Sequence, residues 1–243
     1  MTLDDATQAR LARADRIWNG AFVWALAIVL AQFGAAAYFA QALWPLARVP
    51  LHFDIAGHVN HWGSGRQAAR VMFIVPFVSL CVLGALRLIT KTGPRREGLA
   101  ATPRLFAAVL VGVPLMLLAV VIVIGGSMLA PAPEAAIGWR VRIVLGLWGA
   151  LFAGLGNFLG KTHRNWWMGV RTPWSLSSDL AWAKSNRLAG RIMVLTGLAT
   201  MLAASFAGVR MATIALAGGT VVMALSAVYV SWAVWRRDPN RTA

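Results

Sequence analysis

The chain has 243 residues, of which 59% are hydrophobic and only 13% carry a charge. A soluble domain has about 25% charged residues, so this composition argues against an ordinary soluble protein and indicates an integral membrane protein. The net charge is +15, but the basic residues flank apolar segments and form no hydrophilic domain, so we predict no direct binding of nucleic acid.

Residues 1–17 mix acidic and basic side chains and are predicted to be a cytosolic lead-in. Six apolar blocks follow, each close to the ~20 residues that a helix needs to cross a bilayer. They lie at 18–43, 71–89, 105–130, 143–160, 189–209 and 212–235. Because backbone groups in lipid must be paired within their own segment, these blocks predict helices, and the fold class is an all-α integral membrane protein with six transmembrane helices.

We divide the chain into four regions. Residues 1–17 are the lead-in, and 18–104 form an N-terminal membrane region with a structured outer loop at 44–70. Residues 105–235 form a C-terminal membrane region that contains the sequence Arg171-Thr172-Pro173-Trp174, and 236–243 are a tail.

The distribution of basic residues predicts the orientation. Seventeen of the 23 Lys and Arg residues lie in the lead-in, the second loop, the fourth loop and the tail. Positive charge is enriched on the cytoplasmic side, so both termini and these two loops are predicted to be cytoplasmic. No ionisable residue lies deep in any block, which argues against a proton- or ion-coupled transporter.

The first loop, on the predicted outer side, holds all but one of the histidines. His52, Asp54, His58 and His61 could together bind zinc or copper, since imidazole and carboxylate suit these metals. However, their spacing matches no standard metal motif, and histidines in a polar turn more often bond to solvent or backbone. We therefore predict no metal site, with metal binding by these residues as an alternative.

The fourth loop, on the predicted inner side, is dense in polar, aromatic and turn-forming residues. Pro173 should push Thr172 out of helical geometry. Ser175, Ser177 and Ser178 are candidate N-caps for a short interfacial helix over 178–187, with Asp179 in its first turn. This loop is either a structural connection between two spanning helices or a docking surface for a partner.

Small residues predict one close helix contact. Gly156 and Gly160 are four residues apart in the fourth block, with Gly146, Gly149 and Ala153 before them. Such spacing lets two helices approach closely, so these residues are interpreted as a packing surface.

Two stretches together resemble the SdpI immunity-protein family. The family signature is matched by Asn165, by the run Met168-Gly169-Val170-Arg171-Thr172-Pro173-Trp174-Ser175-Leu176-Ser177-Ser178, and by Trp182 and Ala189-Gly190. The small domain that precedes the signature in many members is matched by Pro50, His52, Phe53, Gly57, Trp62, Gly63 and Ser64. The chain departs from that domain's pattern at Asn60 and Gly65.

The resemblance implies a multi-pass protein of the bacterial inner membrane without enzymatic activity or cofactor. One member of the family protects its cell from a secreted peptide toxin and holds a transcriptional autorepressor at the membrane. The expected partners are therefore membrane lipid, a peptide toxin outside and a cytosolic repressor inside. The expected partner-binding residues are Asn165, Gly169, Arg171, Thr172, Pro173, Trp174 and Ser175 inside, and His52, Phe53, Gly57 and Trp62 outside.

Two other function classes stay open from the sequence. A passive small-molecule permease would need a polar path through the bundle, for which Asn157 and Thr196 are the candidate lining residues. A metal-dependent membrane protein would use the outer-loop histidines.

Overall fold

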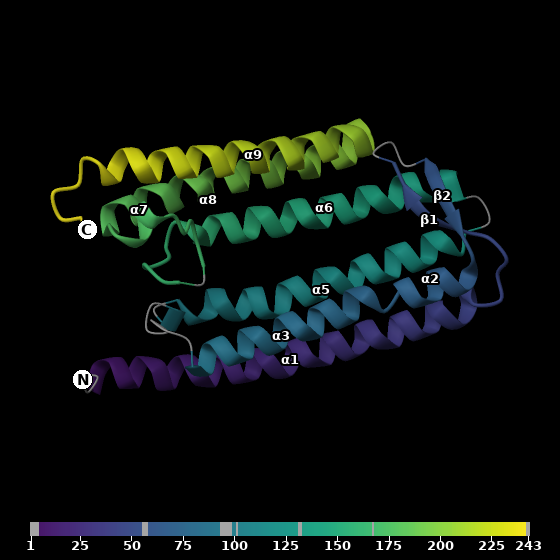
Figure 1. Ribbon diagram of the computed structural model, residues 1–243, viewed down its shortest axis with the longest axis horizontal. Coiled ribbons are helices and arrows are strands. Elements are labelled where there is room, and N and C mark those ends of the chain that lie inside the picture. The colour runs from purple at the N-terminus through teal and green to yellow at the C-terminus, as the bar shows by residue number, and fades with distance from the viewer. Residues whose placement is uncertain are drawn as a thin grey trace.

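The computed structural model describes residues 5–54, 58–92, 99–100, 102–130, 133–166 and 168–241. Within these ranges the protein is a bundle of long helices with one two-stranded β-hairpin (Figure 1). Five stretches of helix are long and apolar enough to cross a bilayer, which agrees with the predicted all-α membrane fold. Many large apolar side chains point outward, among them Phe206 with 85% of its surface exposed, and such a surface fits contact with lipid rather than water.

The first half of the chain packs three long helices together. These are α1 (Asp5–Leu43), α3 (Ile74–Thr92) and α5 (Pro103–Met128). The ring of Trp18 on α1 meets Phe106 on α5 edge to face, with 5.5 Å between the ring centroids. Deeper in the bundle, the Gln32 Nε2 donates to the Pro114 carbonyl at 2.7 Å. The helix α1 begins within the predicted lead-in, at Asp5.

A β-hairpin follows α1, at the end of the bundle opposite the start of α1 and the end of α9 (Figure 1). Its strands, β1 (Val49–Phe53) and β2 (Val59–Gly63), are antiparallel and lead into α2 (Gly65–Val71). The Gly65 amide donates to the Leu46 carbonyl at 2.9 Å, and a Cβ at Gly65 would lie 1.9 Å from the Leu43 carbonyl oxygen. Only glycine fits this close approach, which fixes the hairpin to the end of α1.

The second half packs α6 (Pro133–Leu159), α8 (Asp179–Leu202) and α9 (Gly208–Trp235). Small residues set the distance between α6 and α8: a Cβ at Gly156 would lie 2.7 Å from the Gly190 carbonyl, and one at Gly197 would lie 2.3 Å from that of Gly149. The predicted glycine packing surface is therefore confirmed, and α8 is its partner.

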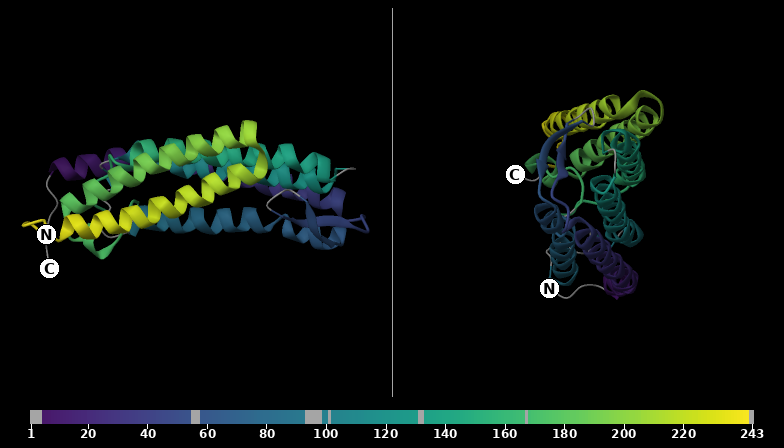
Figure 2. Two further views of the ribbon diagram at one scale, coloured as in Figure 1. Left: turned by 90° about the horizontal axis from the view of Figure 1, so that it is seen from above. Right: turned by 90° about the vertical axis from the view of Figure 1, so that its right-hand side faces the viewer.

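The chain reverses direction between α8 and α9. A π-helical turn, η1 (Ala203–Ala207), is followed by Gly208 with φ of 87°. The helical residues run without interruption from Asp179 to Trp235, a stretch of 57 residues, but the chain folds back at this turn. As a result, α8 and α9 lie side by side (Figures 1 and 2). Seen end-on, the two halves of the chain occupy opposite sides of the bundle (Figure 2).

The prediction of a separate interfacial helix over 178–187 is wrong. These residues are the first turns of α8, which continues unbroken to Leu202. The reason is that the buried face of this segment, with Trp182 and Asn186, continues directly into Ala189 and Gly190. The short helix of this loop is instead α7 (Pro173–Leu176).

Candidate functional site

The signature loop, defined here as residues 160–178, connects the end of α6 to the start of α8. Its turn is organised by Asn165, which is only 2% exposed. The Asn165 Oδ1 accepts the Met168 N–H at 2.7 Å, and its Nδ2 donates to the carbonyls of His163 at 2.8 Å and Met168 at 3.2 Å. One amide side chain thus satisfies backbone groups of an irregular turn that has no ladder of its own.

Gly169 lets this turn pack closely against α8. Its φ of +118° is unfavourable for any residue with a side chain, and a Cβ there would lie 2.5 Å from the Asn186 Oδ1. The close approach lets the Asn186 Oδ1 accept the Val170 N–H at 2.8 Å. On the same face of α8, the Trp182 Nε1 donates to the Thr162 carbonyl at 2.9 Å. The loop is therefore held at both ends by side chains of one helix.

The Thr-Pro-Trp-Ser segment forms α7 and its cap. Thr172 is extended, with φ of −91° and ψ of 159°, as the following proline predicted. The Thr172 Oγ1 accepts the Ser175 N–H at 3.1 Å, while the Ser175 Oγ accepts the Thr172 N–H at 3.0 Å and donates to the Val170 carbonyl at 2.6 Å. This capping box is joined to α9, because the hydroxyls of Thr172 and Ser231 lie 2.8 Å apart.

Ser178 is the N-cap of α8, one of three caps that the sequence allowed. Its Oγ accepts the Ala181 N–H at 2.9 Å and donates to the carboxylate of Asp238, which follows α9. This hydrogen bond, with a second from the Asn240 N–H, lowers the pKa of Asp238. Nearby, Asp179 pairs with the Arg164 Nε at 3.1 Å. The C-terminal tail is thus tied to the start of α8.

The predicted partner-binding residues of this loop divide into two groups. Asn165 and Ser175 are buried, and Gly169 and Thr172 are half-buried with their contacts inside the protein. Arg171 and Pro173 are exposed, and Trp174 is half-buried. The guanidinium of Arg171 also donates to the Trp166 carbonyl at 2.8 Å, which holds Arg171 at the surface.

Three residues of the site were not predicted: Asn186, Ser231 and Asp238. Asn186 had a weak signal, since it lies four residues after Trp182 and so shares its helix face. Ser231 and Asp238 had none, because their partners lie 59 and 60 residues away along the chain.

At the opposite end, the polar residues of the hairpin bond to one another. The His52 Nδ1 lies 2.6 Å from the Asn60 Oδ1, and the His58 Nδ1 lies 3.3 Å from the Asp54 Oδ2. Trp62 is exposed, with the Arg48 guanidinium 4.5 Å from its ring centroid. Of the other predicted residues, Phe53 is part of β1 and Gly57 lies outside the described residues.

The histidines do not converge on one point. Within the described ranges, which include His52, Asp54, His58 and His61, no three His, Cys, Asp or Glu side chains are grouped so that they could hold a metal ion. The geometry of the hairpin therefore gives no support to the metal-dependent alternative.

The part of the chain that matches known proteins is the signature loop and the two helices that follow it. Residues 161–234 match the model of the SdpI/YfhL protein family. Over 76 residues the chain is 30% identical to the protein named Immunity protein SdpI of Bacillus subtilis (strain 168). The aligned segment covers 30% of this chain and 37% of that protein. The match thus spans little more than a third of the relative's length. No solved structure matches the chain.

Proposed function

We propose that the protein is a membrane immunity protein that protects a bacterial cell from an extracellular antimicrobial peptide. The premise is that residues 161–234 match the SdpI/YfhL protein family. Its place would be the inner membrane. The observation that carries the proposal is the match of this segment to a protein named for immunity. The arrangement of the bundle supports it, because an exposed aromatic hairpin lies at the end opposite the signature loop (Figure 1).

The proposed topology has six crossings with both termini in the cytoplasm. It treats α8 and α9 as two spans, since the chain folds back at Gly208. An even number of crossings agrees with the start of α1 and the end of α9 lying at one end of the bundle (Figure 1). The basic signature loop lies at that same end (Figure 1), which the positive-inside rule assigns to the cytoplasm.

In this topology the hairpin is the surface that meets the peptide. Trp62 and Arg48 offer a stacked aromatic and cationic pair, and His61 on the same strand is also exposed. Aromatic and arginine side chains are enriched at binding hot spots. Inside the cell, the buried part of the signature loop would hold α6, α8 and α9 in register. Its exposed Arg171 and half-buried Trp174 would contact a regulator with an acidic surface.

The protection assay uses bacteria that express the chain and a panel of purified antimicrobial peptides. We expect the wild-type protein to raise the concentration of at least one peptide needed for killing, and Trp62→Ala to remove this protection. Trp139→Ala is the matched control, because Trp139 is an exposed tryptophan on α6 and not on the hairpin. Equal killing with and without the wild-type chain, at confirmed membrane expression, would refute the immunity function.

The regulator is tested separately by transcript profiling of cells with the wild-type chain and with Arg171→Glu. A regulator held at this surface predicts that the variant changes a defined set of transcripts while peptide protection stays intact. Identical transcript sets would exclude Arg171 as a docking residue.

The permease alternative has one of its two candidate residues in a cavity, because Asn157 lines a pocket of about 600 Å³ together with Gly190 and Arg191. Asn157 is exposed on α6, whereas Thr196 is buried and lies where a Cβ on Gly219 of α9 would touch it. A groove of about 370 Å³ does lie between α5 and α6, but its lining is apolar, with Gly112, Met116, Leu147 and Leu151 among its residues. The packing therefore does not favour a polar path past Asn157 and Thr196.

A further inference from the structure

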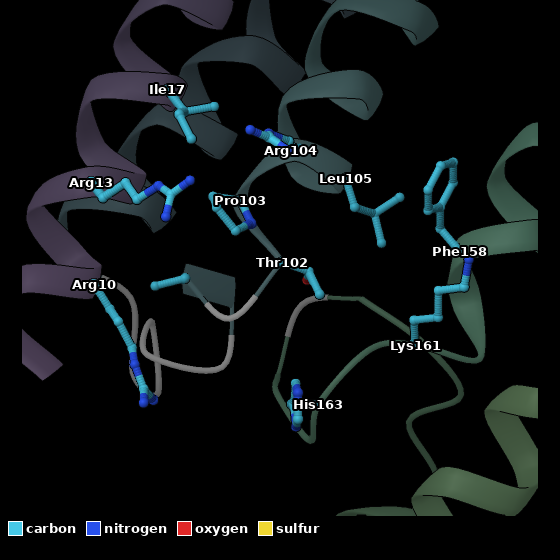
Figure 3. A pocket seen from close by; sticks show the side chains of 11 residues that line it. Arg10, Arg13, Ile17, Thr102, Pro103, Arg104, Leu105, Phe158, Lys161 and His163 are labelled. Carbon is cyan, nitrogen blue, oxygen red and sulfur yellow. The ribbon is translucent and has the colours of Figure 1, made fainter. Parts of the chain in front are cut away.

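A cationic pocket opens at the end of the bundle where α1 begins. It has a volume of about 560 Å³ and lies between α1, the start of α5 and the signature loop (Figure 3). Its charged lining is Arg10, Arg13, Arg104 and Lys161, with His163 beside them. No Asp or Glu is among the described residues that line it. Like charges from three separate segments are thus brought together.

Several other arginines of the protein have guanidinium groups that are already bonded. At the other end of the bundle, Arg140 donates to the Gly126 carbonyl, and Arg142 donates to the Ala204 and Ser205 carbonyls where the chain reverses. In contrast, Arg10, Arg13 and Arg104 have no hydrogen bond or ion pair within the described part of the chain. Gathering unpaired cations is unfavourable unless an anion joins them.

The start of α5 adds to the positive potential of the pocket. Thr102 is the N-cap of this 26-residue helix but makes no side-chain capping bond, and Pro103 and Arg104 follow it in the pocket wall. A helix N-terminus carries partial positive charge and favours a phosphate. In α5 this is mainly the helix dipole and the Arg104 amide, because Pro103 has no N–H and the Leu105 N–H donates to the Thr102 carbonyl. The helix end therefore acts in the same direction as the three arginines.

The pocket is apolar on its inner side. Ile17, Leu105 and Phe158 line it there, and all three lie at the boundary of an apolar block: α1 becomes apolar after Ile17, α5 begins at Pro103 and α6 ends at Leu159. The pocket is thus at the level where lipid headgroups meet acyl chains. A free anion would use only the charged side, whereas a phospholipid would use both.

We propose that this pocket binds the phosphate headgroup of an anionic phospholipid from the surrounding leaflet. Arg10, Arg13 and Arg104 contact the phosphate, and the apolar side receives the first carbons of the acyl chains. Basic pockets between membrane helices are suited to such headgroups. The lipid would join α1 and α5 of the first half to α6 of the second half. The proposal depends on the membrane placement of the bundle but not on the immunity function.

The test measures lipid binding to the purified full-length protein by native mass spectrometry, with phosphatidylglycerol and phosphatidylcholine of the same acyl chains. The wild type should bind one phosphatidylglycerol with clear preference. Because each basic residue adds attraction for an anionic headgroup, the triple variant Arg10→Gln, Arg13→Gln, Arg104→Gln should lose at least about tenfold in affinity. The matched control is Arg16→Gln, Lys184→Gln, Arg237→Gln, which removes the same charge from residues outside the pocket and should stay within about twofold.

Equal loss in both triple variants would overturn the proposal, because it would mean attraction by overall charge alone. So would equal binding of the two lipids by the wild type. Millimolar sodium phosphate and soluble glycerophosphoglycerol are the competitors: failure of both to displace the lipid supports a lipid site, whereas displacement by phosphate alone would assign the pocket to a free anion. If the triple variant does not fold, Arg104→Gln alone is measured, and unchanged affinity would refute the proposal.

Discussion

The two ends of the bundle use their polar side chains in opposite ways. In the signature loop, Asn165, Ser175 and Asn186 are buried and bond to backbone groups of the loop and of α8. In the hairpin, the rings of His52 and His58 lie in hydrogen-bonding distance of Asn60 and Asp54 and stay exposed. Buried polar groups cost free energy when a partner is lost, whereas exposed ones return to water. The buried residues that carry the family resemblance therefore support the fold, whereas Arg171 and Pro173, which also carry it, are exposed.

The largest effect is expected for Gly169→Ala. The substitution places a Cβ 2.5 Å from the Asn186 Oδ1 at a φ of +118°, and the strain together with the displaced loop should lower the free energy of unfolding by about 3 kcal/mol. Unfolding is followed in mixed detergent micelles by circular dichroism. Gly154→Ala is the control, since that site on α6 is open and alanine should be neutral or add up to about 1 kcal/mol there. An unchanged free energy of unfolding for Gly169→Ala would contradict the close packing of the loop against α8.

Asn186→Ala should have the next largest effect. It removes the acceptor of the Val170 N–H, and an unpaired buried backbone amide costs about 2 kcal/mol. The comparison is with Asn157→Ala, at an exposed site on α6, where a change within about 0.5 kcal/mol is expected. Both variants are measured in the same unfolding assay. Equal losses of unfolding free energy would mean that the buried amide of Asn186 stabilises the fold no more than the exposed amide of Asn157 does.

The link between Ser178 and Asp238 should appear as a pH dependence. The Ser178 hydrogen bond holds the pKa of Asp238 below its ordinary value of 3.8, so the folded state binds the proton less readily than the unfolded chain does. The stabilisation is therefore complete well above pH 3.8 and is lost as the pH falls below it. Asp238→Asn should remove this acid-dependent part of the unfolding free energy, while Asp5→Asn, at an exposed site on α1, should keep it. Identical pH profiles for the wild type and Asp238→Asn would show that the tail is not held in this way.

The smallest effect is expected at the hairpin. His58 is exposed, and its ring pairs with Asp54, which is itself partly exposed, so His58→Ala should change the free energy of unfolding by less than about 0.5 kcal/mol. A loss as large as that of Asn186→Ala would mean that the hairpin, too, is a support of the fold.

Local rules predicted the local parts of this structure. The apolar blocks indicated the helices, Pro173 indicated the extended Thr172, and Ser178 was a predicted cap. The contacts that join the site to the rest of the protein were not predictable, because Ser231 and Asp238 reach the loop from a helix and tail far along the chain. The continuous α8 was missed for a related reason: its first turns are held by packing against the loop, which the apolar pattern does not record.

The most direct test places a single cysteine at each end of the bundle. In a Cys81→Ala background, Trp62→Cys on the hairpin and Trp166→Cys in the signature loop are treated with a membrane-impermeant maleimide, both sites being exposed. We predict labelling of the hairpin cysteine in intact cells and of the loop cysteine only after the membrane is permeabilised. Labelling of both in intact cells would contradict the assignment of the hairpin to the outside and of the signature loop to the cytoplasm.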